Sequence, residues 1–144
     1  MPEQNYFNHR RNVPMYHAVT FGLIVLSLIG SVSNLIKSLG QHAGLYSASL
    51  LVVVFIVLLL LFFFARSFAL KAQDRAIRAE ENLRHFVMTG KLLDSRLTIR
   101  QIIGLRFAPD AEYLELCKRA IAENLSEDAI KKAIKNWRAD YYRV

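Results

Sequence analysis

The longest apolar stretch of the chain runs from Leu50 to Ala65 and contains no polar side chain. With its flanks it covers residues 46–70, which exceeds the ~20 helical residues needed to cross a hydrocarbon core of ~30 Å. A core helix of a soluble protein carries polar side chains on one face, whereas this stretch is apolar all round. The pattern therefore predicts a membrane-spanning helix over residues 46–70.

A second, less hydrophobic stretch over residues 16–39 predicts another membrane span. The intervening residues 40–45 are too few for a domain, so we expect an antiparallel transmembrane hairpin with a short external loop. Small and polar side chains of the first span fall on one helical stripe, formed by Ser27, Gly30, Ser31 and Asn34. Because small side chains let helix backbones approach closely in lipid, we expect this stripe to pack on the second span or on another membrane protein.

Basic side chains are distributed unevenly around the two spans. Only Lys37 lies at the short loop, whereas several Lys and Arg residues precede the first span or follow the second. The positive-inside rule then places both termini in the cytoplasm, including the polar N-terminal segment 1–15. The residues expected to anchor the protein at the membrane interface are Arg10, Arg11, Tyr16, Arg66, Lys71 and Arg75. Anionic lipid is the expected partner of this basic face.

Residues 71–90 predict a cytoplasmic stalk helix that continues the second span. They are rich in good helix formers and lack Gly and Pro until Gly90. The apolar positions that recur at helical spacing are Ala69, Ala72, Ala76, Ala79, Leu83, Phe86 and Val87. We expect this face to lie on the membrane surface or to pair with a partner helix, although it holds too few heptads to predict a coiled coil.

Residues 91–144 predict a small region of three helices. The expected helix caps are Thr98 with Gln101 as a capping box, Asp110 and Ser126. The last two helices are expected over residues 111–123 and 127–139. Each helix carries an apolar stripe, so we expect a small bundle whose limited core is stabilised by docking on the stalk or on a partner. The aromatic side chains expected to contact a partner protein are Trp137, Tyr141 and Tyr142.

The residues that usually carry chemistry are sparse. The single cysteine, Cys117, lies in an apolar helical pattern and is expected to be buried. The histidines are His9, His17, His42 and His85, and none lies in the second span, so a haem held between the spans is not expected. Zinc-ligand spacings, Gly-rich phosphate loops and nucleophile elbows are absent. We therefore predict a non-enzymatic protein without a catalytic residue, metal, cofactor or small-molecule substrate.

The last two expected helices also fit a helix-turn-helix that binds nucleic acid. The basic residues of the second helix would then be Lys131, Lys132, Lys135 and Arg138. Glu127 and Asp128 stand at its N-terminus, however, where contacts with bases or phosphates would be made. We favour surface lysines that balance acidic caps, and nucleic acid is not the expected partner.

Four stretches resemble a family of short bacterial two-span membrane proteins that contain a domain of unknown function. The stretches are Glu3–Arg10, Val13–His17, Ser95–Ala108 and Ile134–Asp140. The resemblance covers nearly the whole chain and implies the two-span topology. It implies no activity, cofactor or catalytic residue.

These observations predict an all-α, multi-pass protein of the bacterial inner membrane, built from a transmembrane hairpin, a cytoplasmic stalk helix and a small three-helix region over 91–144. The expected function is that of an accessory, anchoring or scaffolding subunit of a larger complex, with other membrane protein subunits as partners. Two alternatives stay open. One is a membrane-tethered nucleic-acid-binding protein acting through the C-terminal helices, and the other is a homo-oligomeric small transporter or channel, although the second span lacks pore-lining polar residues.

Overall fold

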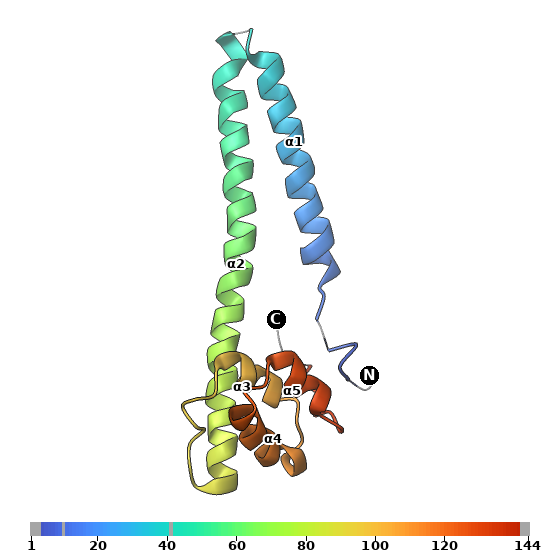
Figure 1. Cartoon of the computed structure of the whole chain (residues 1–144). Helices are drawn as coiled ribbons and strands as arrows, with labels where there is room; N and C mark the ends of the chain where they lie inside the picture. The colour runs from blue at the N-terminus through green and yellow to red at the C-terminus, as the bar shows by residue number, and fades with distance from the viewer. Residues whose placement is uncertain (1–3, 10, 41, 142–144) are drawn as a thin grey trace. The chain divides into compact units, whose positions relative to one another are not determined.

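The computed structural model describes residues 4–9, 11–40 and 42–141, which contain helices and no strand (Figure 1). The helices are η1 (Met15–Thr20), α1 (Phe21–Ser38), α2 (His42–Thr89), α3 (Ile99–Leu105), α4 (Asp110–Ala122) and α5 (Glu127–Ala133). The expected all-α class is confirmed. The chain divides into two units, which we call the hairpin unit (Asn12–Ala69) and the helical unit (Met1–Arg11 with Leu70–Val144).

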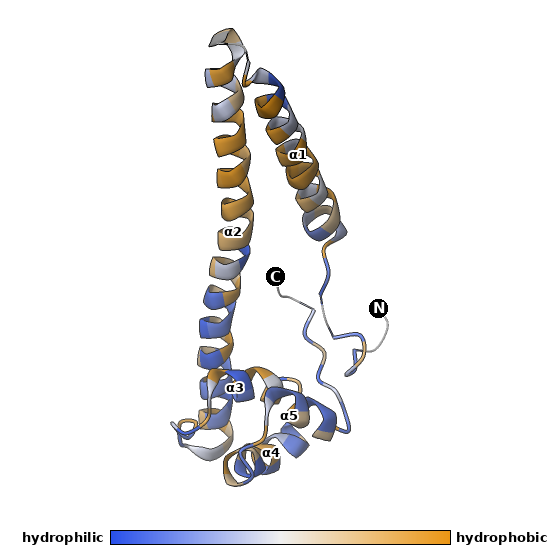
Figure 2. Ribbon diagram, turned by 45° about the horizontal axis from the view of Figure 1, so that its top comes forward, coloured by the Kyte–Doolittle hydropathy of each residue, from blue (hydrophilic) through white to orange (hydrophobic). Residues whose placement is uncertain are grey.

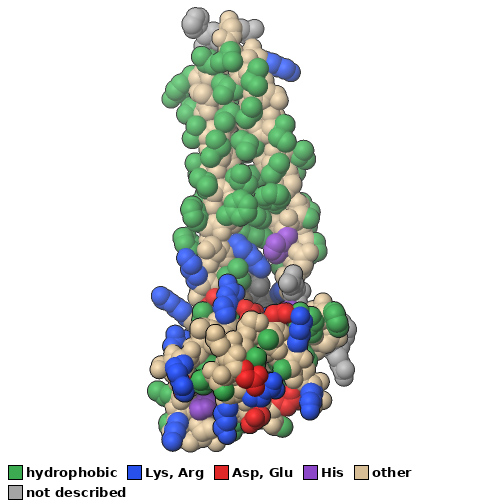
Figure 3. Space-filling view, in the orientation of Figure 1, with side chains coloured by type: hydrophobic (Ala, Val, Ile, Leu, Met, Phe, Trp, Pro, Cys, Tyr) green, Lys and Arg blue, Asp and Glu red, His purple; other side chains and the backbone are tan. Residues whose placement is uncertain are grey.

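In the hairpin unit, α1 and the first part of α2 run antiparallel. Much of this part of α2 is uniformly hydrophobic, whereas α1 mixes hydrophobic turns with more polar ones (Figure 2). The segments Met15–Ser38 and Ala43–Thr89 are each long and apolar enough to contain a membrane span, and 6% of the most apolar window of each is buried. Leu26 and Leu61, for example, are 68% and 55% exposed. Figure 3 shows hydrophobic side chains over the surface of these helices. Because a soluble protein would bury such a surface, the exposure indicates a membrane protein whose hairpin is covered by lipid.

Helix α2 is continuous from His42 to Thr89. It therefore begins before residue 46, where the second span was expected, and includes most of the expected loop. The expected stalk belongs to the same helix, and no break separates it from the span. Gly90 has a φ of 72° and its N–H donates to the Phe86 carbonyl, so it ends α2 in the left-handed conformation that glycine adopts most easily.

The helical unit has a core of its own. Leu105, Phe107, Tyr113 and Ile130 are fully buried in it. Helices α3 and α5 approach so closely at Gly104 that a Cβ added there would lie 3.1 Å from the backbone oxygen of Glu127. A glycine at this position therefore lets the two short helices pack.

Two of the three expected caps of the helical unit are confirmed. Thr98 and Gln101 form a reciprocal capping box at the start of α3, and the Ser126 hydroxyl accepts from the Ala129 N–H at the start of α5. The third expected cap is wrong, because Pro109 is the N-cap of α4 and Asp110 is its first residue. The Asp110 carboxylate instead accepts hydrogen bonds from Arg84.

Helix α5 ends at Ala133 and not at residue 139. Ile134 is extended and buried, and the next two backbone N–H groups, of Lys135 and Asn136, donate to the Glu112 carboxylate at 2.9 and 3.0 Å. Since these donors have a partner on α4, the chain loses no hydrogen bond by leaving the helix. The apolar spacing of the segment is helical, but the carboxylate of another helix decides where α5 stops.

Candidate interaction surfaces

The N-terminal segment lies on the helical unit. The Gln4 side chain exchanges hydrogen bonds with the backbone of Asp140, since the Asp140 N–H donates to Oε1 at 2.8 Å and Nε2 donates to the Asp140 carbonyl. The Tyr6 hydroxyl donates to Asp128, and the Arg11 guanidinium donates to the Tyr141 carbonyl at 3.1 Å. These contacts were not expected from the sequence, which gives no sign that residues 4–9 and 11 meet residues 128–141.

Aromatic rings hold the middle of this segment. His9 lies against the rings of Phe107 and Trp137, with centroids 5.8 and 5.6 Å away, and its Nε2 is 3.3 Å from the Lys131 ammonium. Trp137 also packs on Phe107, at 4.9 Å. Three of the four stretches that carry the family resemblance therefore meet at one place in the helical unit.

The aromatic residues expected to contact a partner have different surroundings. Trp137 is half-buried and uses part of its ring within the helical unit. Tyr141 is 46% exposed, and Tyr142 lies outside the described residues. A contact between these residues and a partner protein stays a prediction.

A buried charge cluster fixes the stalk part of α2 to α4. Arg84 binds Glu81, Asp110 and the carbonyl of Ala108, and its guanidinium lies 4.1 Å from the centre of the Tyr113 ring. Glu81 is 4% exposed, and its carbonyl accepts from the Tyr113 hydroxyl. A buried carboxylate must be paired to keep its charge, so this cluster is structural.

The basic residues of the suggested helix-turn-helix are also largely paired. Lys131 is buried and lies 2.6 Å from Glu127, and Lys132 lies 2.7 Å from Asp128. These ammonium groups already have carboxylate partners on their own helix. Their attraction to the phosphates of a nucleic acid is therefore weaker.

A hollow of about 440 Å³ lies in the helical unit beside the end of α2. We call it the groove. Its apolar lining comes from Leu92, Leu93, Leu97, Leu114 and Ile121. Lys91 and Lys118 also line it, and both are exposed and form no ion pair with the described residues. The Asp94 carboxylate of the groove is held by Arg96, whose hydrogen bonds lower its pKa to about 2, so the unpaired charge of the groove is positive.

Cys117 borders the groove but is not exposed there as a reactive thiol. It is 4% exposed, and burial raises its pKa to about 12 although a hydrogen bond with Tyr113 acts in the opposite direction. The thiolate, which is the reactive form, is therefore scarce at neutral pH. This agrees with the buried thiol expected from the sequence.

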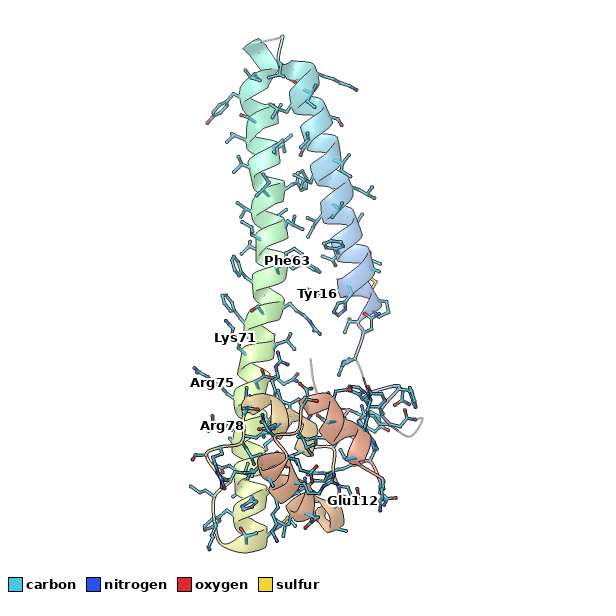
Figure 4. All side chains as sticks on the ribbon, viewed as in Figure 1. Tyr16, Phe63, Lys71, Arg75, Arg78 and Glu112 are labelled. Carbon is cyan, nitrogen blue, oxygen red and sulfur yellow. The ribbon has the colours of Figure 1, made fainter. Side chains whose placement is uncertain are left out.

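The residues expected at the membrane interface lie in both units. Lys71 and Arg75 are exposed and project from the side of α2 away from α3, α4 and α5, as Figure 4 shows. Arg66 is half-buried. In the hairpin unit the Tyr16 ring stacks on Phe62 at 4.3 Å, and its hydroxyl donates to the Phe62 carbonyl, so it joins the first apolar helix to α2. Arg10 lies outside the described residues.

The small-residue stripe of α1 is only partly buried. Ser31 is 6% exposed, and its hydroxyl donates to the Leu28 carbonyl of its own helix. Ser27 is half-buried, whereas Gly30 and Asn34 are exposed. Packing of this stripe on a second membrane protein stays a prediction.

Histidine, cysteine and carboxylate side chains do not gather into a metal site within residues 4–9, 11–40 and 42–141. The His17 ring bonds to the backbone of Val13, and the His85 ring lies 2.8 Å from the Lys91 carbonyl. The His42 side chain lies outside the described part of the chain.

Over residues 1–144 the chain matches a protein family described as a family of unknown function, DUF6526. The chain belongs to this family. No curated protein and no solved structure matches it. The match therefore identifies the family of the chain. The description of that family names no activity.

Proposed function

We propose that this DUF6526 protein is a non-enzymatic anchoring subunit of the bacterial cytoplasmic membrane. Its hairpin holds the helical unit at the cytoplasmic surface, where the groove binds a segment of another subunit of a membrane complex. The groove is the observation that carries the proposal, because Leu92 is 65% exposed on it and its two lysines form no ion pair with the described residues.

The chemistry of the groove defines the segment that it fits. A volume of about 440 Å³ is near the lower end of the roughly 300–1,000 Å³ of ordinary ligand pockets. The groove is therefore large enough to accommodate a few side chains of a partner. Leu92, which is 65% exposed, offers apolar contact, while Lys91 and Lys118 offer positive charge. The partner segment is therefore apolar with acidic residues beside it.

The contacts of the N-terminal segment support placement of both termini on the same side of the membrane. Gln4 and Tyr6 bond to residues near the C-terminus, which supports a topology with both ends of the described chain on one side of the membrane. A chain with two spans has this topology. Lys71 and Arg78 are exposed and unpaired among the described residues, which favours contact with anionic headgroups on that side.

Site-specific photo-cross-linking in cells tests the proposal. A benzophenone amino acid at Leu92, in the full chain at native expression, is expected to give a discrete adduct with a second protein. Lys118→Glu is expected to abolish that adduct, because the new carboxylate offsets the charge of Lys91 and removes the positive charge of the groove. Lys132→Glu is the matched control, since Lys132 is exposed but does not line the groove.

The same amino acid at Phe7 is the positional control, because Phe7 is 91% exposed and does not line the groove. Recovery of the protein only as a lone chain, with no adduct at Leu92, contradicts the proposal. An adduct that persists in the Lys118→Glu variant contradicts it equally.

A further inference from the structure

The stalk part of α2 has one face that its own unit covers and an apolar face that the unit leaves exposed. Ile77 and Glu81 are buried on the covered face. The residues of the other face, which we call the α2 seam, are Ala72, Ala76, Ala79, Leu83 and Phe86, and all five are exposed. Leu83 and Phe86 are 63% and 49% exposed. The helical unit folds without covering this seam.

The spacing of the seam is that of a coiled coil. Successive members are four, three, four and three residues apart, which is the alternation of a and d positions in a heptad repeat. The three alanines have small side chains, so a second helix can approach α2 closely there. The larger Leu83 and Phe86 follow where α2 nears its end at Thr89.

Two charged residues flank the seam. Arg75 precedes the a position at Ala76, and Glu80 follows the d position at Ala79, so they occupy a g and an e position. Both are exposed, and neither forms an ion pair with the described residues. In a parallel two-stranded coiled coil, a g residue faces the e residue five positions later on the other helix. Arg75 of one copy therefore faces Glu80 of the other, and the pair occurs twice by symmetry.

We propose that the α2 seam binds a second copy of this chain in a parallel homodimer. Two copies inserted in one membrane with the same topology present α2 in the same direction, as the parallel arrangement requires. The opposite charges of Arg75 and Glu80 on the two sides of the seam fit a second copy, in which each charge meets its counterpart. The dimer does not depend on the groove, whose residues are different ones.

Cysteine cross-linking of the purified full chain in lipid nanodiscs or mild detergent tests the dimer. Ala79→Cys is expected to give a disulfide-linked homodimer, because the two d positions face each other. Arg78→Cys is the matched control, since position 78 is exposed but lies outside the seam, and it is expected to stay monomeric on the gel. Cys117 is buried and contributes no background. Equal cross-linking at both positions, or no homodimer at position 79, overturns the proposal.

Charge reversal tests the choice of occupant. Arg75→Glu and Glu80→Arg alone each place two like-charged pairs across the dimer and are expected to raise its dissociation constant about tenfold. The double variant restores opposite charges and is expected to recover the original dissociation constant. Failure of the double variant to recover dimerisation overturns the parallel register. A dissociation constant that neither single variant changes overturns the second copy as the occupant.

Discussion

The hairpin unit and the helical unit are both built from helices, yet their apolar side chains face different surroundings. In the hairpin, large side chains such as Leu61 point outward, whereas in the helical unit Phe107 and Tyr113 are fully enclosed. The hairpin therefore needs lipid to satisfy its surface, and the helical unit satisfies most of its own. One helix, α2, belongs to both units. Its surface is apolar on all sides in the hairpin unit and amphipathic in the helical unit.

The largest expected effect follows from removing a core side chain of the helical unit. Phe107→Ala is expected to destabilise that unit by about 3–5 kcal/mol, because it opens a cavity and removes the ring on which His9 and Trp137 pack. Hydrogen exchange of α3, α4 and α5 in the full chain measures the loss. Leu61→Ala in the hairpin is the control and is expected to leave this exchange unchanged. A similar loss of protection from hydrogen exchange in both variants would contradict the conclusion that the helical unit has a core of its own.

A charge introduced at similar exposure separates lipid from water as the surrounding medium. Leu61 is 55% exposed in the hairpin, and Leu92 is 65% exposed in the helical unit. Leu61→Arg is expected to oppose membrane insertion by about 2.5–3.5 kcal/mol, whereas Leu92→Arg is expected to leave insertion unaffected. Fractionation of membranes after expression measures both variants. Normal insertion of the Leu61→Arg protein would contradict the placement of this surface in lipid.

The close contact between α3 and α5 predicts a smaller loss. Gly104→Ala is expected to destabilise the helical unit by about 1–3 kcal/mol, because the added methyl group lies too near the Glu127 carbonyl and the Ile130 side chain. Denaturant unfolding followed by Trp137 fluorescence measures the change, since Trp137 is the sole tryptophan. Gly22→Ala is the control, because nothing lies within 4 Å of a Cβ added at Gly22. Equal stability of the two variants would refute the tight packing.

The smallest expected effect comes from the carboxylate that ends α5. Desolvation raises the pKa of Glu112, but the hydrogen bonds from Lys135 and Asn136 outweigh it and lower that pKa below the ordinary 4.5. The stability that this carboxylate contributes is therefore complete above pH 4.5 and is lost as the pH falls through the lower, folded-state pKa. Glu112→Gln is expected to cost about 1 kcal/mol at neutral pH and to reduce the acid sensitivity.

The control for this effect is Glu115→Gln, on the exposed side of α4. Trp137 fluorescence between pH 3 and pH 7 follows unfolding of both variants. If Glu112→Gln and the unchanged chain lose stability equally as the pH falls, groups other than Glu112 determine the acid sensitivity.

Local signals made much of the fold predictable. The apolar run, the capping box at Thr98 and the stop at Gly90 all depend on residues close together in the sequence, and the structure has each of them. Long-range contacts were not predictable in the same way. Glu112 ends α5 from another helix, and Asp110 binds Arg84 when its own helix could have used it as a cap.

The candidate surfaces show the same limit. The apolar positions of the α2 seam were visible as a pattern, but the pattern does not say which face the helical unit leaves uncovered. The groove is lined by residues of α2, the following loop and α4, so no single stretch of sequence predicts it. The bonds of Gln4, Tyr6 and His9 to the other end of the chain have no local signal either.

In the proposed topology, a membrane separates the turn of the hairpin from the helical unit. Single cysteines at Gly40, Phe7 and Arg96, tested in intact and permeabilised cells with a thiol reagent that cannot cross membranes, examine it directly. Cys117 can stay in place, because burial raises its pKa to about 12 and keeps it unreactive. Labelling at position 40 in intact cells, with labelling at positions 7 and 96 only after permeabilisation, is the expected result. Labelling of all three positions from the same side would contradict the claim.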